Sequence, residues 1–490
     1  MPRLAISYSL IQPLSMLGLI DYLVMATYLA LLVVIGVRAL KAQGSPDEYF
    51  LGGRSIKTAS LTVLWFASWI GGASLVATVN RAYTLGISAV WYVTALGVGC
   101  ILFGLLFAAR VKRLAESHQF LTYPELIESA FDGRTRVIAT ITTILSFMAY
   151  AGGQLAAAAA VIAMLLDLTF EMALALTSLV VVSYTALGGF KGITQTDWIQ
   201  ALLIFFGLIF VGLPIAYSNG GTIDQFHERL PLSFFDIGGW GWAIIIPMAL
   251  SIILSFFVAM DGFTRCYAAE SEATARRAPI IAGLLILPMG IIAVWIGMTA
   301  VMALPDSGGE GDVLTAFVVT FFPQGLKGLM LCGILAAIMS TADICILTAS
   351  GNVTHDLYQR LIAPNASPTQ LLRVSMMASA FIGIMASLLA WQMRDVIDIL
   401  VLGFTINAAA LLLPTLWAVF QWRGYSTASF YSAITGLLVV VGCKFFEPQL
   451  PDHPFFADPL WPGLSGAMII FITLHLLLRG KHSPSSARPT

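Results

Sequence analysis

The stretch Ala67-Ser68-Trp69-Ile70-Gly71-Gly72-Ala73-Ser74 lies in the middle of an apolar segment, residues 57–80, that is long enough to cross a membrane. Glycine in a helix interior costs about 1 kcal/mol relative to alanine, so two adjacent glycines weaken the helix there. Small residues also let helices pack closely, and on their own these glycines favour that structural role. The functional interpretation is an unwound segment whose free carbonyl groups face a cation.

A second apolar segment, residues 240–264, carries Ala259-Met260-Asp261-Gly262-Phe263, which combines an acid with a glycine. The two segments are five spans apart, so they cross the membrane in opposite directions. Interrupted helices at matching positions of two inverted halves indicate the binding site of a transporter. This match favours a functional role over packing for both interruptions.

The composition of the whole chain indicates a membrane protein. Of its 490 residues, 58% are hydrophobic and 10% are charged, whereas soluble domains have about 25% charged residues. This difference excludes a soluble enzyme, so we expect no catalytic residues, and the net charge of −1 gives no basic excess for nucleic acid. Only helices or closed barrels can span a bilayer. We therefore predict an all-α integral membrane protein with about 13 transmembrane helices, at residues 19–40, 57–80, 86–110, 136–164, 171–188, 196–217, 240–264, 276–304, 325–353, 374–393, 397–420, 426–446 and 461–479.

The basic residues orient these spans, because lysine and arginine concentrate on the cytoplasmic side of a membrane. With the N-terminus outside, 19 of the 25 basic residues fall on the cytoplasmic side. We therefore predict a multi-pass protein of the plasma (inner) membrane with its N-terminus outside and its C-terminus cytoplasmic. The chain has no Gly-rich loop with GK[ST], so we expect no nucleotide-binding domain and no ATP-binding partner. The five cysteines match no zinc or redox spacing.

Among the acids of the predicted spans, Asp197, Asp261 and Asp343 are the candidates for a functional role, and the other acids of the chain can be placed in loops or at helix ends. A charge at the centre of a membrane helix costs about 2.5–3.5 kcal/mol on insertion scales, so such an acid needs a cation, a proton or a water-filled cavity. For any one of them, a protonated carboxyl group bonded to a neighbouring helix is an equal alternative. The three together favour a cation path.

Four segments carry motifs that occur together in one family of transporters. The first two are Glu48-Tyr49-Phe50-Leu51-Gly52-Gly53-Arg54 and Gly188-Gly189-Phe190-Lys191-Gly192-Ile193-Thr194-Gln195-Thr196-Asp197-Trp198-Ile199-Gln200. The others are Asp261-Gly262-Phe263-Thr264-Arg265, followed by Ala268-Ala269-Glu270-Ser271, and Ala336-Ala337-Ile338-Met339-Ser340-Thr341-Ala342-Asp343. In this order they resemble the sodium:solute symporter family, and together they span nearly all of the predicted core.

The resemblance implies a LeuT-type core of two inverted five-helix repeats. The expected units are an extra N-terminal helix and cytoplasmic loop (1–56), a first repeat (57–217), a second repeat (240–420), two C-terminal helices (421–479) and a disordered cytoplasmic tail (480–490). It also implies sodium as the coupling ion, held by the backbone carbonyls of Ala67, Ile70 and Ala337 and the hydroxyls of Ser340 and Thr341. Such an oxygen set suits a hard cation. A Ser-Thr pair that only bonds back to its own helix is the structural alternative.

A second cation or proton path is expected at Asp197 and Asp343, because Asp197 matches the family's Thr-Asp motif and Asp343 shares a helix face with Ser340. Three departures from the family pattern bear on these expectations. Trp69 stands where proline transporters carry an aspartate, which argues against a proline-type site. Thr264 replaces the usual glutamine, and Ile344 replaces a frequent serine, which weakens the case for a second cation.

The solute is expected at mid-membrane beside the two interruptions. Asp261 has two alternative roles: it could bind an amine of the solute, or it could pair with Arg265 and act as a gate. For Tyr150, core packing is at least an equal interpretation. The solute-binding candidates are Gly71, Gly72, Ala73, Ser74, Tyr150, Gln154, Phe257, Met260 and Asp261.

We therefore predict a sodium-coupled symporter that imports a small polar organic solute by alternating access. Its expected partners are that solute, sodium and the lipid bilayer. Proton coupling through Asp197 and Asp343 is one alternative. A sensor or channel-like protein that has lost coupling is the other, although the intact Ala337, Ser340 and Thr341 argue against it.

Overall fold

The computed structural model describes residues 17–41, 54–120, 122–188, 198–199, 201–305, 312–446, 451, 453 and 455–479. The described part of the chain is helical apart from turns and an isolated bridge between Ile56 and Ala269. This confirms the predicted all-α class. Its helices are α1 (Leu19–Lys41), α3 (Thr58–Trp69), α4 (Gly72–Leu85), η3 (Gly86–Ala89), α5 (Val90–Leu106), α6 (Ala108–His118), α7 (Tyr123–Ala130), α8 (Gly133–Leu166), α9 (Phe170–Gly188), η4 (Gly207–Gly212), α11 (Leu213–Ser218), α12 (Ile223–Arg229), η5 (Leu232–Phe235), α13 (Trp242–Phe256), α14 (Met260–Ala268), α15 (Glu272–Ala303), α16 (Val313–Phe321), α17 (Leu326–Gly351), η6 (Asn352–Ile362), α18 (Pro368–Met393), α19 (Val396–Phe420), α20 (Ser426–Phe445) and α21 (Leu460–Leu478).

Ten helical stretches in the described part of the chain are long and apolar enough to cross a membrane. Two shorter apolar helices, Leu19–Tyr28 and Phe170–Ser183, add to them. The predicted number of thirteen spans is therefore not confirmed. One physical reason is the first interruption, which leaves α3 with only 12 residues, too few for a span of its own. Helix α4 continues through η3 into α5, so residues 74–106 form one apolar stretch where the ends of two spans were predicted.

The first predicted interruption is present. Helix α3 ends at Trp69, Ile70 leaves the helical conformation (φ −99°, ψ 19°), and Gly71 is extended (φ −51°, ψ 169°) before α4 begins. The last carbonyl groups of a helix have no partner in their own helix. The break therefore frees carbonyl oxygens in the middle of the apolar segment.

The second interruption lies slightly before the predicted position. Helix α13 ends at Phe256, Ala259 is extended (φ −70°, ψ 120°), and α14 begins at Met260. Asp261 therefore occupies the first turn of α14 and does not lie in the break itself. An acid is favourable there because the N-terminus of a helix carries partial positive charge.

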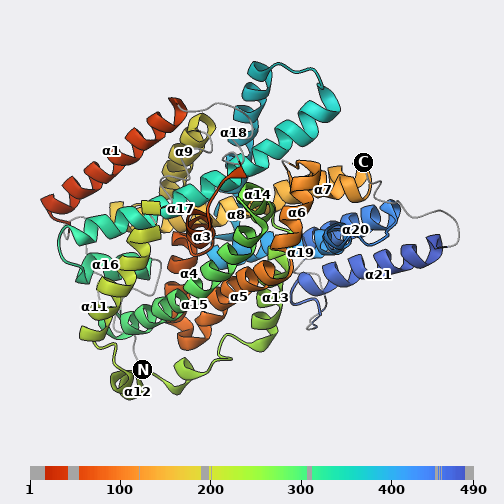
Figure 1. Cartoon of the computed structure of the whole chain (residues 1–490). Helices are drawn as coiled ribbons and strands as arrows, with labels where there is room; N and C mark the ends of the chain where they lie inside the picture. The colour runs from red at the N-terminus through yellow and green to blue at the C-terminus, as the bar shows by residue number, and fades with distance from the viewer. Residues whose placement is uncertain are drawn as a thin grey trace.

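The long helices pack side by side into a bundle (Figure 1). Helix α15 packs against α3, α4 and α5, while α8 packs against α17 and α19. Helices α20 and α21 form a pair at one flank, and α1 lies against α17. Close approach explains some of the glycines: a Cβ atom on Gly283 of α15 would lie 2.5 Å from the carbonyl oxygen of Gly97 on α5.

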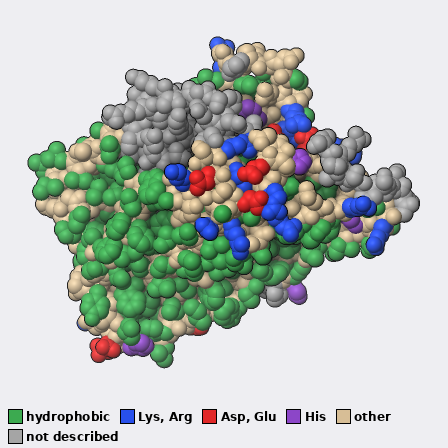
Figure 2. Space-filling model, viewed as in Figure 1, with side chains coloured by type: hydrophobic (Ala, Val, Ile, Leu, Met, Phe, Trp, Pro, Cys, Tyr) green, Lys and Arg blue, Asp and Glu red, His purple; other side chains and the backbone are tan. Residues whose placement is uncertain are grey.

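The surface matches a membrane environment. Figure 2 shows hydrophobic side chains over most of one face, with lysine, arginine and acidic side chains gathered at the end that carries α6 and α14. Arg113 of α6 and Glu272 at the start of α15 form an ion pair of 2.6 Å in this region. An apolar band with charges collected at its edge is typical of a lipid-facing surface.

Candidate functional site

Three oxygen atoms from two helices converge on Gly71, at the end of the first interruption. A Cβ atom on Gly71 would lie 3.1 Å from Thr341 Oγ1, 3.2 Å from Ala67 O and 3.8 Å from Ala337 O. Ala67 belongs to the last turn of α3, and the other two residues lie one turn apart on α17. Five oxygens were predicted to surround a cation, and these are three of them.

The Thr341 hydroxyl is oriented by its own helix. Its Oγ1 donates a hydrogen bond of 2.9 Å to Ala337 O. This bond back to its own helix is the structural alternative that was given for the Ser-Thr pair. Because the proton points at the carbonyl, the lone pairs of Oγ1 remain available on its other side. Ile70 is buried at the end of α3. The side chain of Ser340, one residue before Thr341, lies outside what the structure describes.

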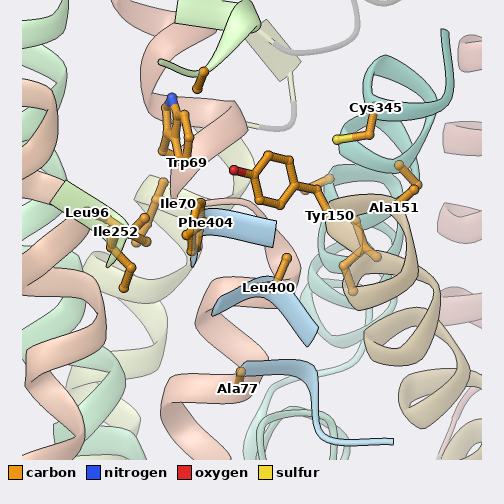
Figure 3. Packing of buried hydrophobic residues seen from close by; sticks show 14 of the residues in the cluster. Trp69, Ile70, Ala77, Leu96, Tyr150, Ala151, Ile252, Cys345, Leu400 and Phe404 are labelled. Atoms are coloured by element: carbon orange, nitrogen blue, oxygen red, sulfur yellow. The ribbon is translucent and has the colours of Figure 1, made fainter. Parts of the chain in front are cut away.

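A cavity of about 50 Å³ lies beside these oxygens, enough for a few water molecules. Thr341 belongs both to its wall and to the oxygen cluster. In Figure 3, Tyr150 extends from α8 toward Trp69 and Phe404. The wall consists of Ser68, Trp69, Ser74, Tyr92, Leu96, Phe147, Tyr150, Gln154, Asp261, Arg265, Thr341, Ile344, Cys345, Leu400 and Phe404.

Asp261 is paired with Arg265, as one of its two predicted roles requires. Arg265 Nη1 donates to Asp261 Oδ2 at 2.6 Å, and Nη2 donates to Ser68 Oγ of α3 at 2.6 Å. The guanidinium carbon also lies 5.0 Å from the ring centre of Trp65, a cation–π contact. The second oxygen of Asp261 is buried and makes no hydrogen bond within the described part of the chain.

Tyr150 combines the packing and polar roles that were considered for it. Its hydroxyl lies 3.0 Å from Ser255 Oγ and accepts a hydrogen bond of 3.1 Å from Asn407 Nδ2. Its ring packs 5.0 Å from that of Phe404. Gln154, one turn further along α8, is only 5% exposed, and its Oε1 has no hydrogen-bond partner among the described residues. Buried polar groups are normally satisfied, so this amide is a candidate solute contact.

Comparison with known protein families identifies the family of the chain. Residues 49–436 match the model of the sodium:solute symporter family. The chain belongs to that family. It is therefore a multi-pass membrane symporter that couples the import of a solute to sodium. The other members of the family, and the proteins similar to this chain, are transporters.

Similar proteins support the assignment. The sodium/proline symporters of Staphylococcus aureus strains JH9 and NCTC 8325 are each 25% identical over 483 residues, covering 95% of this symporter and 93% of the relative. A Na⁺-coupled sialic acid symporter, solved in a substrate-bound outward-open state, superimposes with a TM-score of 0.76 at 22% identity, covering 96% of this chain and 100% of that one. A nucleobase-cation-symport-1 family transporter in a closed conformation gives a TM-score of 0.56 at 15% identity, covering 89% and 96%. These likenesses confirm the LeuT-type fold.

Some predicted solute contacts of the symporter lie away from the cavity wall. The ring of Phe257 packs 4.8 Å from Phe107 and 6.3 Å from Phe103. Met260 is buried at the start of α14, where its carbonyl accepts from Thr264 Oγ1 at 3.0 Å. Neither residue is part of the wall. Both were predicted as solute contacts because they adjoin the second interruption, which the structure places between Phe256 and Met260.

The small residues of the first interruption divide between two roles. Gly71 adjoins the oxygen cluster, whereas Ser74 lines the cavity and donates from Oγ to Trp69 O at 3.1 Å. Gly72 and Ala73 form the first turn of α4. Ser74 therefore satisfies one of the carbonyl groups that the break releases.

The second predicted cation path is described only at Asp343. This carboxylate is 1% exposed and accepts a short hydrogen bond from Thr185 Oγ1 of α9. Asp197 lies outside the described residues. Thr185, Ser255 and Asn407 were missed by the sequence analysis. For Asn407 the signal was available, because an amide in the apolar run 397–420 needs a buried partner.

Proposed function

We propose that sodium binds at the first interruption and that a small polar organic solute binds in the adjoining cavity. The observation that supports this proposal is the convergence of Thr341 Oγ1, Ala67 O and Ala337 O on Gly71. The carbonyl of Ile70 and the hydroxyl of Ser340 complete the proposed ligand set. Hard cations are bound by such neutral and carbonyl oxygens at about 2.4 Å.

The solute class is proposed from the cavity wall. Its aromatic side chains suit the body of a small molecule, while Gln154 and Asp261 offer unused acceptor oxygens. The similar proteins named above are symporters of proline and of sialic acid, so proteins of this fold can transport polar organic solutes. Trp69 takes the place of the aspartate of proline transporters, which disfavours proline itself.

Alternating access would link the two sites. Sodium from outside would fix the end of α3 and thereby raise the affinity for the solute, and the coupling is reciprocal. At 100 mV the membrane potential adds about 2.3 kcal/mol per sodium ion. In this proposal the repeats 57–217 and 240–420 form a core bundle, and rocking of that bundle opens the site to the inside. The N-terminus lies outside, and the protein works in the plasma membrane.

The Thr341→Ala variant tests the sodium site. The full-length protein in detergent is titrated with NaCl at an ionic strength held constant with KCl, and its melting temperature is recorded. Sodium should raise the melting temperature of the wild type, because a ligand that binds only the folded state stabilises it. The variant should need about tenfold more sodium, the effect of losing one ligand worth about 1.4 kcal/mol. An unchanged titration would remove Thr341 from the site.

Proton coupling is the second candidate. It is favoured by the deep burial of Asp343 and its hydrogen bond to Thr185, because a buried carboxyl group can carry a proton through a transport cycle. We propose that Asp343, with Asp197, forms this second cation or proton path. Separate sodium and pH gradients distinguish the two candidates.

A further inference from the structure

Arg265 connects the two interrupted helices directly. From α14 it donates one hydrogen bond to Asp261 on its own helix and one to Ser68 on α3, both at 2.6 Å. Its guanidinium also stacks over Trp65, one turn before Ser68. The arginine side chain is 9% exposed and that of Asp261 is 13% exposed. The planar guanidinium holds its donors in a fixed fork and can stack on an aromatic ring at the same time, a geometry that the point-like ammonium group of a lysine does not offer.

The residue that Arg265 holds on α3 adjoins the proposed sodium ligands. Ser68 directly follows Ala67, whose carbonyl oxygen is one of the three that converge on Gly71. Both residues belong to the last turn of α3, where backbone carbonyl groups have no helical partner and the chain is easily distorted. Holding Ser68 therefore fixes the direction in which Ala67 O points.

The arginine and its two hydrogen-bond partners also line the solute cavity. Ser68, Asp261 and Arg265 all belong to its wall. One oxygen of Asp261 holds Arg265, while the other is without a hydrogen bond among the described residues. A donor group of a solute on that second oxygen would hold the carboxylate in place, and with it Arg265 and Ser68. The cluster thus lies on a path from the cavity to the oxygens at Gly71.

We infer that Arg265 is a positioning residue for the sodium site: it fixes the end of α3 through Ser68, under the control of Asp261 in the solute cavity. This inference rests on the proposed sodium site. The competing explanation is that Arg265 only neutralises the buried charge of Asp261. The two explanations predict different sodium affinities for a variant that lacks the charges of both Asp261 and Arg265.

The test uses sodium alone, so it needs no identified solute. Full-length wild type, Ser68→Ala, Arg265→Lys and the double variant Asp261→Asn with Arg265→Gln are titrated with NaCl at constant ionic strength. The apparent sodium affinity is read from the melting temperature, and hydrogen exchange of the peptide covering residues 66–71 reports the order of the end of α3. Arg113→Gln is the matched control, because it removes an arginine from an exposed 2.6 Å pair with Glu272.

Ser68→Ala and the double variant should each lose about tenfold in sodium affinity, the scale of one hydrogen bond to a charged group. In both variants the peptide 66–71 should exchange its hydrogens faster than in the wild type. The sodium affinity and exchange rate of Arg265→Lys should lie between those of the wild type and the double variant, and those of Arg113→Gln should match the wild type. Wild-type affinity in the double variant would show that Arg265 only balances charge, and equal losses in Arg113→Gln would show a nonspecific effect; either result overturns the inference. A wild type that does not respond to sodium would instead overturn the proposed sodium site.

Discussion

Gly71 lies where oxygen atoms of α3 and α17 come together, and its lack of a side chain makes this approach possible. The Gly71→Ala variant would place a methyl group 3.1 Å from Thr341 Oγ1 and 3.2 Å from Ala67 O. These oxygens would have to shift, and a small hard cation tolerates little change in its ligand distances. We expect a loss of about tenfold or more in sodium affinity, or about 1.4 kcal/mol, measured by sodium titration of the melting temperature.

Gly442→Ala is the control for this substitution. Gly442 lies in α20, and a Cβ atom there would have no neighbour within 4 Å. Its sodium titration should match that of the wild type. Sodium affinity in Gly71→Ala equal to that of Gly442→Ala would contradict the placement of the ion beside Gly71.

At the scale of helices, Asp21 anchors α1 to the helix that carries Thr341. Its carboxylate is fully buried and accepts hydrogen bonds from the backbone N–H groups of Gly18, Gly325 and Gly328 at 2.9, 2.7 and 3.0 Å. Two of these groups lie at the start of α17, where backbone donors lack helical partners. Asp21 of α1 therefore acts as a cap for another helix.

Asp21→Ala should lower the stability by about 2 kcal/mol, because it leaves buried N–H groups without an acceptor. The measurement is the melting temperature of the purified protein without sodium. Asp224→Ala, in the first turn of α12, removes an exposed acid and should change little. If both substitutions had the same small effect, Asp21 would not anchor α1.

Asp312 gives the start of α16 a dependence on pH. It precedes the helix, accepts from Leu314 N at 3.1 Å and from Thr315 Oγ1, and lies outside the membrane-spanning stretches. Burial raises the pKa of Asp312 to about 6, although these hydrogen bonds lower it. The folded protein therefore keeps this proton to a higher pH than the unfolded chain, which releases it near pH 4.

Because the folded state binds this proton more tightly, stability should decline as the pH rises from about 4 to about 6, by up to about 3 kcal/mol. Asp312→Asn cannot titrate and should lose this part of the decline. Melting temperatures of both proteins at a series of pH values between 4 and 7 provide the measurement. An identical slope for the two proteins would show that Asp312 does not titrate in this range.

At the scale of the whole molecule, polar contacts join the proposed halves 57–217 and 240–420 at several places. Arg265 reaches Ser68, Arg136 of α8 pairs with Asp356 of η6, and Arg81 of α4 pairs with Asp395 before α19 at 2.7 Å. The cavity of about 50 Å³ has room for a few water molecules and must widen to hold an organic solute of several atoms. We therefore expect the helices around it to shift during alternating access.

The sequence predicted the all-α membrane class because composition and span length depend on local chemistry alone. The LeuT-type core was expected from the family resemblance of four motifs, and the predicted number of spans is not confirmed. The sequence also predicted the first interruption, and it gave the pairing of Asp261 with Arg265 as one of two alternatives, since both follow from short spacings. It could not predict that Phe257 packs against Phe107 and Phe103 and is not part of the cavity wall, because the end of α13 depends on packing between helices. The contacts of Tyr150 with Ser255 and Asn407 join segments more than a hundred residues apart, and such distances need the folded chain.

The central claim is that sodium drives solute uptake. The most direct measurement is uptake into proteoliposomes of a labelled solute, chosen by a sodium-dependent thermal-shift screen of amino acids, carboxylates, sugars and quaternary amines. Gradients of sodium, potassium and protons are imposed separately. We expect the solute to accumulate with an inward sodium gradient, and we expect this accumulation to be lost in Thr341→Ala. Equal uptake with potassium alone, or uptake driven only by a pH gradient, would contradict it.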